Sequence, residues 1–301
     1  MSSRVLDGRA VASRLWRELS DRMALLVADG QPAPRLAIVR FDGDPATAVY
    51  AASLVRAARS IGLEPVEVVP PADAAMPDIA ARIGALNRDP GVAGIVIGQP
   101  IPDHLEAEAV LELIDPAKDV DGATPLNVGR LGRGAPGFSP ATARSVMAIL
   151  RAYEIPIAGR RAVVVGRSAV VGRPVASLLL AADATVVICH SRTRNLARET
   201  RRAEILVVAA GQPGLIRAEM VNRSAVVIDC GINAGEGGIV GDVDYEAVRP
   251  VVRAITPVPG GVGPVTTMVV MEQTVQAAEL ARDEGRGQLE RFQLPAGRAR
   301  R

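Results

Sequence analysis

The sequence predicts an α/β protein that contains two domains, each built around a parallel sheet. Three observations support this prediction. The chain has 301 residues, which is enough for two domains of ordinary size. Segments with the apolar patterns of strands and helices alternate along it. The strand-like runs are continuously apolar rather than alternating, which is typical of parallel sheets covered by helices on both faces.

Composition excludes several classes of function. The formal net charge is +2, which gives no reason to expect a nucleic-acid partner. No uncharged apolar stretch reaches the roughly 18 residues of a membrane span, and the N-terminus lacks the apolar core of a signal peptide. Cys189 and Cys230 are the only cysteines, too few for a disulfide framework. We therefore expect a cytoplasmic protein without a membrane partner.

The first half of the chain predicts strands and helices in alternation. A strand at Pro34–Phe41 precedes a helix at Asp44–Gly62. In that helix Asp44 is the expected N-cap, Pro45 lies in the first turn and Gly62 ends the helix. A strand, a helix and a strand are then predicted at residues 66–70, 76–88 and 91–100.

A long segment rich in glycine and proline, Asp115–Pro140, interrupts this pattern and predicts a linker or a functional loop. A connecting helix and a second series of strands follow, at residues 141–154, 161–166, 184–190, 204–211 and 225–231. A glycine–proline loop then leads into a long helix. We expect a first domain, a second domain, a helix that completes the first domain, and a flexible tail, at residues 1–140, 141–261, 262–284 and 285–301.

The first strand of the second series ends in a turn that suits a nucleotide. Gly166, Arg167, Ser168 and Gly172 lie between this strand and the next helix, although their spacing is not Gly-x-Gly-x-x-Gly. Backbone N–H groups and the positive end of the helix would face one point there, which suits a phosphate group.

The end of the following strand indicates which cofactor to expect. In doubly wound sheets this position meets the adenosine ribose, where an acidic residue favours NAD. Here the chain has His190, Ser191 and Arg192 instead, and Arg167 offers a guanidinium for a 2′-phosphate. NADP is therefore the expected cofactor. The alternative is that the glycines only shape a turn.

Further motifs extend over nearly the whole chain before residue 285. They are "LDGRAVA", "DPATAVY", "GIVIGQPIP", "KDVDGATPLNVGRL", "VVGRSAVVGRPVASLLL", "CHSRT", "VIDCGIN", "GDVD" and "ITPVPGGVGPVT". Together they resemble the bifunctional methylenetetrahydrofolate dehydrogenase/cyclohydrolase family.

The resemblance implies two α/β domains flanking a cleft, the second with a Rossmann-like doubly wound sheet. It also implies a homodimer that acts on tetrahydrofolate one-carbon derivatives with NADP and with no metal. The cofactor-binding residues that it implies are Gly166, Arg167, Ser168, Gly172, Ser191 and Ile232. The folate-binding residues that it implies are Tyr50, Asp121, Pro259, Gly260 and Gly261.

The chain departs from the family pattern where proton transfer is expected. The family has a lysine four residues after the tyrosine, on the same helix face, and this position is Leu54 here. The family's glutamine after the third strand is replaced by Gly98, and Gln99 follows one place later. Lys118 is the only lysine in the chain, and a solvated loop lysine is its alternative reading. The candidate catalytic residues are therefore Tyr50, Asp121, Gln99 and Lys118.

These departures affect the two reactions of the family differently. Oxidation of 5,10-methylenetetrahydrofolate transfers a hydride and removes no proton, so it mainly needs positioning. Hydrolysis of the methenyl product needs proton transfers, which a positioned acid or base accelerates by about 10²–10⁴-fold. We expect dehydrogenase activity with the cyclohydrolase weak or lost. The alternatives are a fully bifunctional enzyme with compensating residues, a dehydrogenase for another N-methylene or imine substrate, and an NADP-binding protein without catalysis.

Overall fold

The computed structural model describes residues 3–42, 45–235 and 238–284. The chain divides into two compact units. Unit 1 contains Met1–Ser13 and Thr142–Thr266, and unit 2 contains Arg14–Ala141 and the described chain from Thr267 onward. The predicted N-cap Asp44 and the predicted flexible tail at 285–301 lie outside the described residues.

Unit 1 is built around a six-stranded sheet in which every neighbouring pair of strands is parallel. Its spatial order is β1-β11-β8-β7-β5-β6. The chain passes from β5 to β6 on one side and then crosses to β7 on the other, so the sheet is doubly wound and reverses at β5. This confirms the predicted α/β class and the Rossmann-like sheet. The strands are β1 (Arg4–Val5), β5 (Arg161–Val165), β6 (Thr185–Cys189), β7 (Ile205–Val208), β8 (Val226–Asp229) and β11 (Ala254–Ile255).

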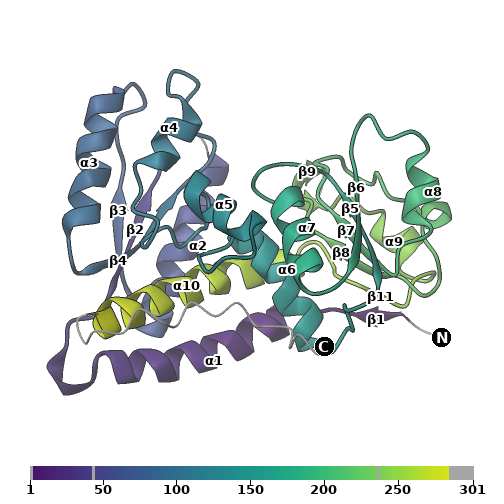
Figure 1. The fold of residues 1–301 in the computed structure, drawn as a ribbon, viewed down its shortest axis with the longest axis horizontal. Helices are drawn as coiled ribbons and strands as arrows, with labels where there is room; N and C mark the ends of the chain where they lie inside the picture. The colour runs from purple at the N-terminus through teal and green to yellow at the C-terminus, as the bar shows by residue number, and fades with distance from the viewer. Residues whose placement is uncertain (1–2, 43–44, 236–237, 285–301) are drawn as a thin grey trace. The chain divides into compact units, whose positions relative to one another are not determined.

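Helices cover both faces of this sheet. Figure 1 shows α7 (Gly172–Ala181) on one side and α8 (Leu196–Thr200) and α9 (Tyr245–Val248) on the other. One core is aliphatic and joins Val163, Leu206 and Val227 of the strands to Val248 of α9. Burial on both faces explains why these strands are continuously apolar. The unit's other described elements are η2 (Ala218–Met220), β9 (Asn233–Gly235) and β10 (Gly238–Val240), and α6 (Ala141–Ala152) leads into it.

The N-terminal residues contribute a strand to unit 1. Arg4 and Val5 form β1, which pairs with Ala254 and Ile255 of β11, and the Leu6 N–H donates to the Ile255 carbonyl at 2.8 Å. The sequence had placed these residues with the first domain, at 1–140. The sheet places them with the second strand series, because this pairing is set by residues about 250 positions apart that no local pattern connects.

Unit 2 contains a three-stranded parallel sheet in the order β3-β2-β4. The β2–β3 and β3–β4 crossovers run in opposite directions across the sheet, so right-handed connections place their helices on opposite faces. On one face Ile79 and Ile83 of α3 are buried with Val39 and Ile95 of the strands. The elements are η1 (Ala28–Gly30), β2 (Arg35–Val39), α2 (Pro45–Ile61), β3 (Glu64–Val68), α3 (Met76–Arg88), β4 (Val92–Ile97), α4 (Ala107–Glu112) and α5 (Pro125–Gly132).

Two long helices each contribute residues to both units. The helices α1 (Gly8–Leu26) and α10 (Val262–Glu284) each begin in unit 1 and continue in unit 2. Within the described part of the chain, no helix combines the length and the apolarity that crossing a membrane would require.

Candidate functional site

The predicted nucleotide turn lies between β5 and α7. Gly166 has a φ of 120°, and a Cβ on it would lie 2.0 Å from the Ala209 carbonyl oxygen at the end of β7. A Cβ on Gly172 would lie 2.3 Å from the Gly166 oxygen. Both positions therefore require glycine, because the backbones approach too closely for a side chain. The Ser168 hydroxyl accepts hydrogen bonds from the N–H groups of Val171 and Gly172, so it shapes the start of α7.

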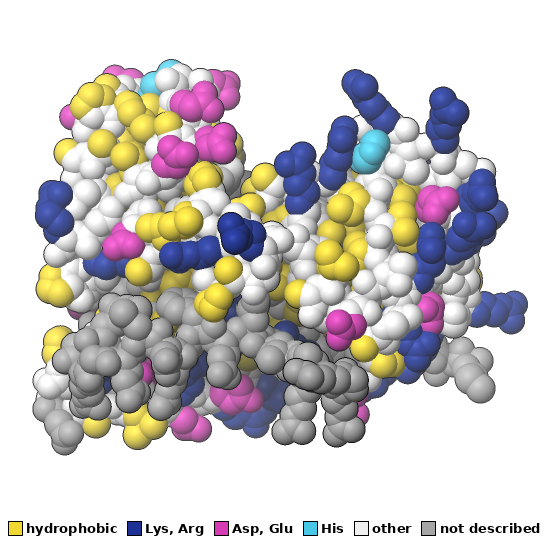
Figure 2. Space-filling model, viewed as in Figure 1, with side chains coloured by type: hydrophobic (Ala, Val, Ile, Leu, Met, Phe, Trp, Pro, Cys, Tyr) yellow, Lys and Arg dark blue, Asp and Glu magenta, His cyan; other side chains and the backbone are white. Residues whose placement is uncertain are grey.

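The edge of unit 1 beside this turn is basic. Arg167, Ser191 and Arg192 are exposed, and no carboxylate forms an ion pair with either arginine among the residues that the structure describes. Figure 2 shows arginine side chains gathered around a histidine on this unit. The backbone N–H of His190 donates to the Thr193 hydroxyl at 2.8 Å, which fixes the turn after β6. This edge suits a phosphorylated ribose, as the sequence predicts.

The predicted folate pair comes together in unit 2. Burial raises the pKa of Tyr50 on α2, and the charge of Asp121 raises it further, so the phenol and the carboxylate are electrostatic neighbours. Burial also raises the pKa of Asp121 to about 7, and the charge of Asp119 contributes to this shift. An acid with a pKa close to neutrality can hold or release a proton under ordinary conditions.

Two buried polar residues that the sequence reasoning missed hold the Asp121 segment. The Asp119 carboxylate accepts from the N–H groups of Ala123 and Thr124 and from the Asn127 amide, at 2.8–3.0 Å. Gln273 of α10 donates its amide to the carbonyls of Val120 and Ser139 at 2.8 and 3.1 Å, and its Oε1 accepts from the Ser139 N–H. The sequence signals were a second aspartate in "KDVDG" and polar residues after the apolar run in "MVVMEQTV".

Lys118 is partly buried, and its ammonium group is held by the backbone rather than by this pair. Its ammonium donates to the carbonyls of Leu86, Asn87 and Asp89, at 3.2, 2.7 and 2.7 Å, and so caps the C-terminal end of α3. Burial lowers its pKa, the carboxylates of Asp115 and Asp89 oppose this effect, and the charge of Arg35 adds to it. We do not retain Lys118 as a catalytic candidate, because all three of its donors are used by the backbone.

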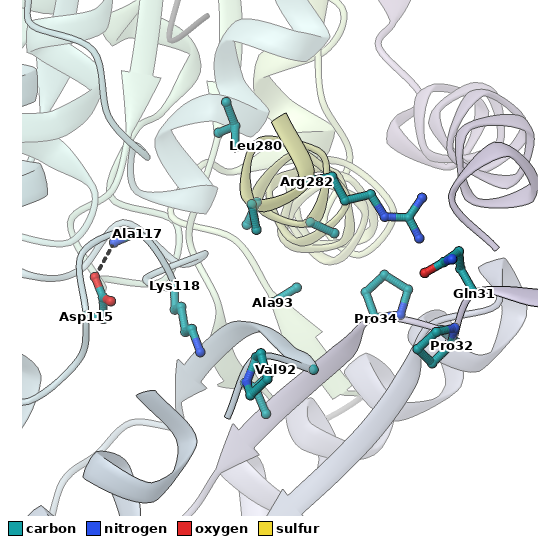
Figure 3. A pocket seen from close by; sticks show the side chains of 16 residues that line it. Gln31, Pro32, Pro34, Val92, Ala93, Asp115, Ala117, Lys118, Leu280 and Arg282 are labelled. Atoms are coloured by element: carbon teal, nitrogen blue, oxygen red, sulfur yellow. Dashed lines mark hydrogen bonds between the residues drawn. The ribbon is translucent and has the colours of Figure 1, made fainter. Parts of the chain in front are cut away.

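The pocket beside Lys118 lies at the opposite end of the sheet from the predicted site. It is lined by residues that precede β2 and β4, such as Pro32, Pro34 and Pro90, and by the end of α10 (Figure 3). The chain at Lys118–Asp121 runs parallel to β4, with Asp119 bridged to Ile95. Lys118 therefore lies toward the amino end of β4 and Asp121 toward its carboxyl end, where Gly98 and Gln99 follow.

Leu54 and Gly98, two positions that depart from the family pattern, carry no group that can donate or accept a proton. Leu54 is completely buried on α2, four residues after Tyr50. A Cβ on Gly98 would lie 2.6 Å from Cγ2 of Thr47, so this position has no room for a side chain. Gln99 is exposed, and its carbonyl accepts from the Thr47 hydroxyl at 2.6 Å. Pro259, Gly260 and Gly261, the other predicted folate residues, belong to unit 1, as does Ile232, which is 72% exposed after β8.

A doubly wound sheet with a glycine turn after its first strand and a basic second strand end defines the class of dinucleotide-binding domains. Two family models specify the class further. The catalytic domain of tetrahydrofolate dehydrogenase/cyclohydrolase matches residues 6–121, and the NAD(P)-binding domain of the same family matches residues 140–282. The chain belongs to the tetrahydrofolate dehydrogenase/cyclohydrolase family, which confirms the resemblance seen in the sequence.

Individual relatives agree with this assignment. The chain is 49% identical over 280 residues to "Bifunctional protein FolD" of Bordetella avium, which covers 93% of this chain and 98% of the relative. The protein of the same name from Acidiphilium cryptum is 49% identical over 94% of this chain and 100% of its own length.

Solved structures show the same architecture. The bifunctional enzyme FolD from Campylobacter jejuni has a TM-score of 0.90 with 40% identity, covering 93% of this chain and 99% of its own. The Trypanosoma brucei FolD, solved with NADP and an inhibitor, has a TM-score of 0.89 with 36% identity, covering 94% of this chain and 99% of its own.

Proposed function

We propose that this protein oxidises 5,10-methylenetetrahydrofolate to 5,10-methenyltetrahydrofolate with NADP, and that its cyclohydrolase activity is weak or lost. The observation that carries the second part is Leu54, a completely buried aliphatic side chain one helical turn from Tyr50. An aliphatic group neither donates nor accepts a proton, and Gly98 adds no side chain at the other departing position.

The oxidation depends on positioning rather than on proton transfer. The methylene carbon loses a hydride. The lone pair of the adjacent nitrogen stabilises the positive charge that forms on this carbon, and the product is an amidinium cation. The Gly166 turn, Arg167 and Ser191 would hold NADP, whose nicotinamide ring would supply the hydride acceptor. Asp121, when ionised, accepts hydrogen bonds from the amino and amide N–H groups of the pterin, and Tyr50 packs beside it. Neither residue has to exchange a proton during this step.

The hydrolysis makes a stronger demand on the side chains. Water adds to the methenyl carbon, loses a proton, and a ring nitrogen must gain one before it leaves. The raised pKa of Tyr50 keeps its phenol protonated near neutral pH, so it is a poor base. Because no lysine lies beside Tyr50, the hydrolysis lacks the roughly 10²–10⁴-fold acceleration that a positioned acid or base supplies.

The cofactor preference follows from the basic edge of unit 1. Arg167, Ser191 and Arg192 are exposed beside the Gly166 turn and suit a 2′-phosphate. The Trypanosoma brucei relative was solved with NADP. We also propose a homodimer, on the family resemblance alone, and light scattering of the purified chain tests it.

A second candidate is the fully bifunctional enzyme. Its support is the pKa of Asp121, about 7, which suits acid–base work, together with the names of the relatives. In this case Asp121 would transfer the protons that the expected lysine transfers in other members of the family.

Two assays on one preparation separate these candidates. NADP reduction is followed with methylenetetrahydrofolate, and decay of the methenyl absorbance is followed with and without enzyme. We expect turnover in the first assay and a decay close to the enzyme-free rate in the second. Methenyl decay well above that rate supports the bifunctional enzyme, and absence of both activities refutes both candidates.

A gain of cyclohydrolase activity would test whether the missing lysine is the cause of the weak hydrolysis. Leu54→Lys with Gly98→Gln, Gln99→Leu and Thr47→Ser restores the family's groups, where Thr47→Ser makes room for the new glutamine. The matched control carries Leu54→Met in place of Leu54→Lys, which keeps the volume without a proton donor. Only the lysine variant should accelerate the hydrolysis.

A further inference from the structure

The Asp242 carboxylate organises the loop that follows β7. Asp242 is completely buried. Its Oδ2 accepts from the N–H groups of Ala210 and Gly211 at 2.6 and 2.9 Å, and its Oδ1 accepts from the Gln212 N–H at 2.9 Å. Three successive backbone donors therefore converge on one carboxylate, which fixes the course of the chain just beyond the strand.

The same carboxylate also holds the loop that follows β8. The Asn233 amide donates to Asp242 Oδ1 at 2.8 Å. Asn233 follows Ile232, the exposed residue assigned to the cofactor by resemblance. With four donors the carboxylate has filled its hydrogen-bonding capacity, and it joins two loops that are far apart in the sequence.

A second buried aspartate fixes Asp242 in turn. The Asp229 carboxylate, at the end of β8, accepts from the N–H groups of Gly231, Asp242 and Val243 at 2.8, 3.1 and 2.9 Å. The Asp229 N–H donates to the Thr256 hydroxyl at 2.8 Å. The position of Asp242 is thus set by the sheet itself.

The place of these loops in the sheet identifies what they serve. β6 lies on one side of β5, and β7 and β8 lie on the other. The end of β6 carries Ser191 and Arg192, where the phosphorylated ribose is expected. A dinucleotide that crosses the carboxyl ends of the strands at their point of reversal then directs its nicotinamide half toward β7 and β8. The Ala209 carbonyl, at the start of the β7 loop, also packs directly against Gly166.

We infer that Asp242 is a positioning residue for the nicotinamide half of the cofactor, acting through the loops after β7 and β8. The inference rests on the proposed NADP site. Asp242 does not itself touch the cofactor, because its acceptors are fully used by the protein. It aligns the chain against which the nicotinamide ring is held, and a displacement of about 1 Å there can cost on the order of 10²-fold in rate.

Asp242→Asn tests this, because it keeps the size but turns one oxygen into an NH₂ group that faces backbone donors. Isothermal titration measures the affinities for 2′,5′-ADP, which lacks the nicotinamide half, and for NADP; a steady-state assay gives kcat. We expect 2′,5′-ADP affinity within about twofold of the unmodified protein, with NADP binding weakened and kcat reduced about 10-fold to 100-fold. Asp244→Asn is the matched control, since Asp244 is an exposed carboxylate that only caps α9.

Asn233→Ala is a milder second variant. It removes the side-chain link to Asp242 and a longer hydrogen bond to the Val240 carbonyl, at 2.8 and 3.3 Å, and it keeps the test valid if Asp242→Asn does not fold. It should lower kcat with 2′,5′-ADP affinity retained. Equal losses for 2′,5′-ADP and NADP, or unchanged kcat in a folded variant, overturn the inference. Failure of the unmodified protein to bind NADP would instead refute the proposed function, so the two failures are distinguishable.

Discussion

Gly98 stands where the family has a glutamine, and the Thr47 side chain leaves no room for one. The steric coupling between positions 98 and 47 can be measured. A Cβ at position 98 would lie 2.6 Å from Cγ2 of Thr47, well inside the roughly 3.5–4.0 Å at which carbon atoms attract. Thr47 is 3% exposed and its hydroxyl donates to the Gln99 carbonyl at 2.6 Å. Rotating the methyl group away would therefore break a buried hydrogen bond, which costs about 0.5–1.5 kcal/mol.

We expect Gly98→Gln alone to lower the free energy of unfolding by about 1–3 kcal/mol, the usual cost of an overpacked core. Thr47→Ser removes the methyl group and keeps the hydroxyl, and by itself should cost about 0.8 kcal/mol for one lost CH₂. The double variant should be more stable than the sum of the single effects by about 1 kcal/mol. Any effect of Gly98→Gln on the unfolded chain cancels in this comparison.

Urea unfolding of the four proteins in the cycle gives the coupling energy directly. Thr47→Val is the control partner, because it keeps a methyl group and loses the hydroxyl, and so should not relieve the clash. Additive effects of Gly98→Gln and Thr47→Ser, or equal relief by Thr47→Val, would refute the steric argument.

Three further predictions concern single side chains. Arg167→Ala should weaken NADP binding by about 10-fold to 100-fold, since a hydrogen bond to a charged group contributes about 1.5–3 kcal/mol. The affinity for NAD should stay nearly unchanged. Equal losses of affinity in titrations with NADP and NAD would remove the 2′-phosphate assignment. The folate KM should fall as pH rises through about 7, because the Asp121 carboxyl ionises there, and Asp121→Asn should flatten this profile while NADP affinity stays constant. The raised pKa of Asp121 also makes the free energy of unfolding depend on pH. Between about pH 4 and 7 the folded chain binds this proton more tightly than the unfolded chain, so the free energy of unfolding should fall as pH rises over that range. Lys118→Met should lower the free energy of unfolding by about 1–3 kcal/mol through loss of the α3 cap without changing kcat; a large loss of kcat in a folded variant would return Lys118 to the catalytic candidates.

Much of the fold and part of the site could be predicted from local sequence patterns. The apolar runs indicated the strands, and the glycine turn indicated Gly166 and Gly172, because both features depend on neighbouring residues. The roles of Asp119 and Gln273 could not be predicted, since each depends on partners brought together by the fold. Gln273 reaches Ser139 across 134 positions. The same reason explains Lys118, for which the sequence offered a catalytic role or a solvated loop position, and which the structure places on the end of α3.

The dependence of the Asp121 segment on α10 affects how this chain matures during synthesis. Val120 and Ser139 lie early in the chain, yet the amide that joins them belongs to Gln273. A nascent chain emerges from the ribosome at roughly 5–20 residues per second, N-terminal end first. The β5–β11 series can therefore form its sheet while unit 2 still lacks its last helix. Although unit 2 supplies most of the early sequence, the segment that carries Asp121 can reach its final arrangement only after Gln273 has been synthesised.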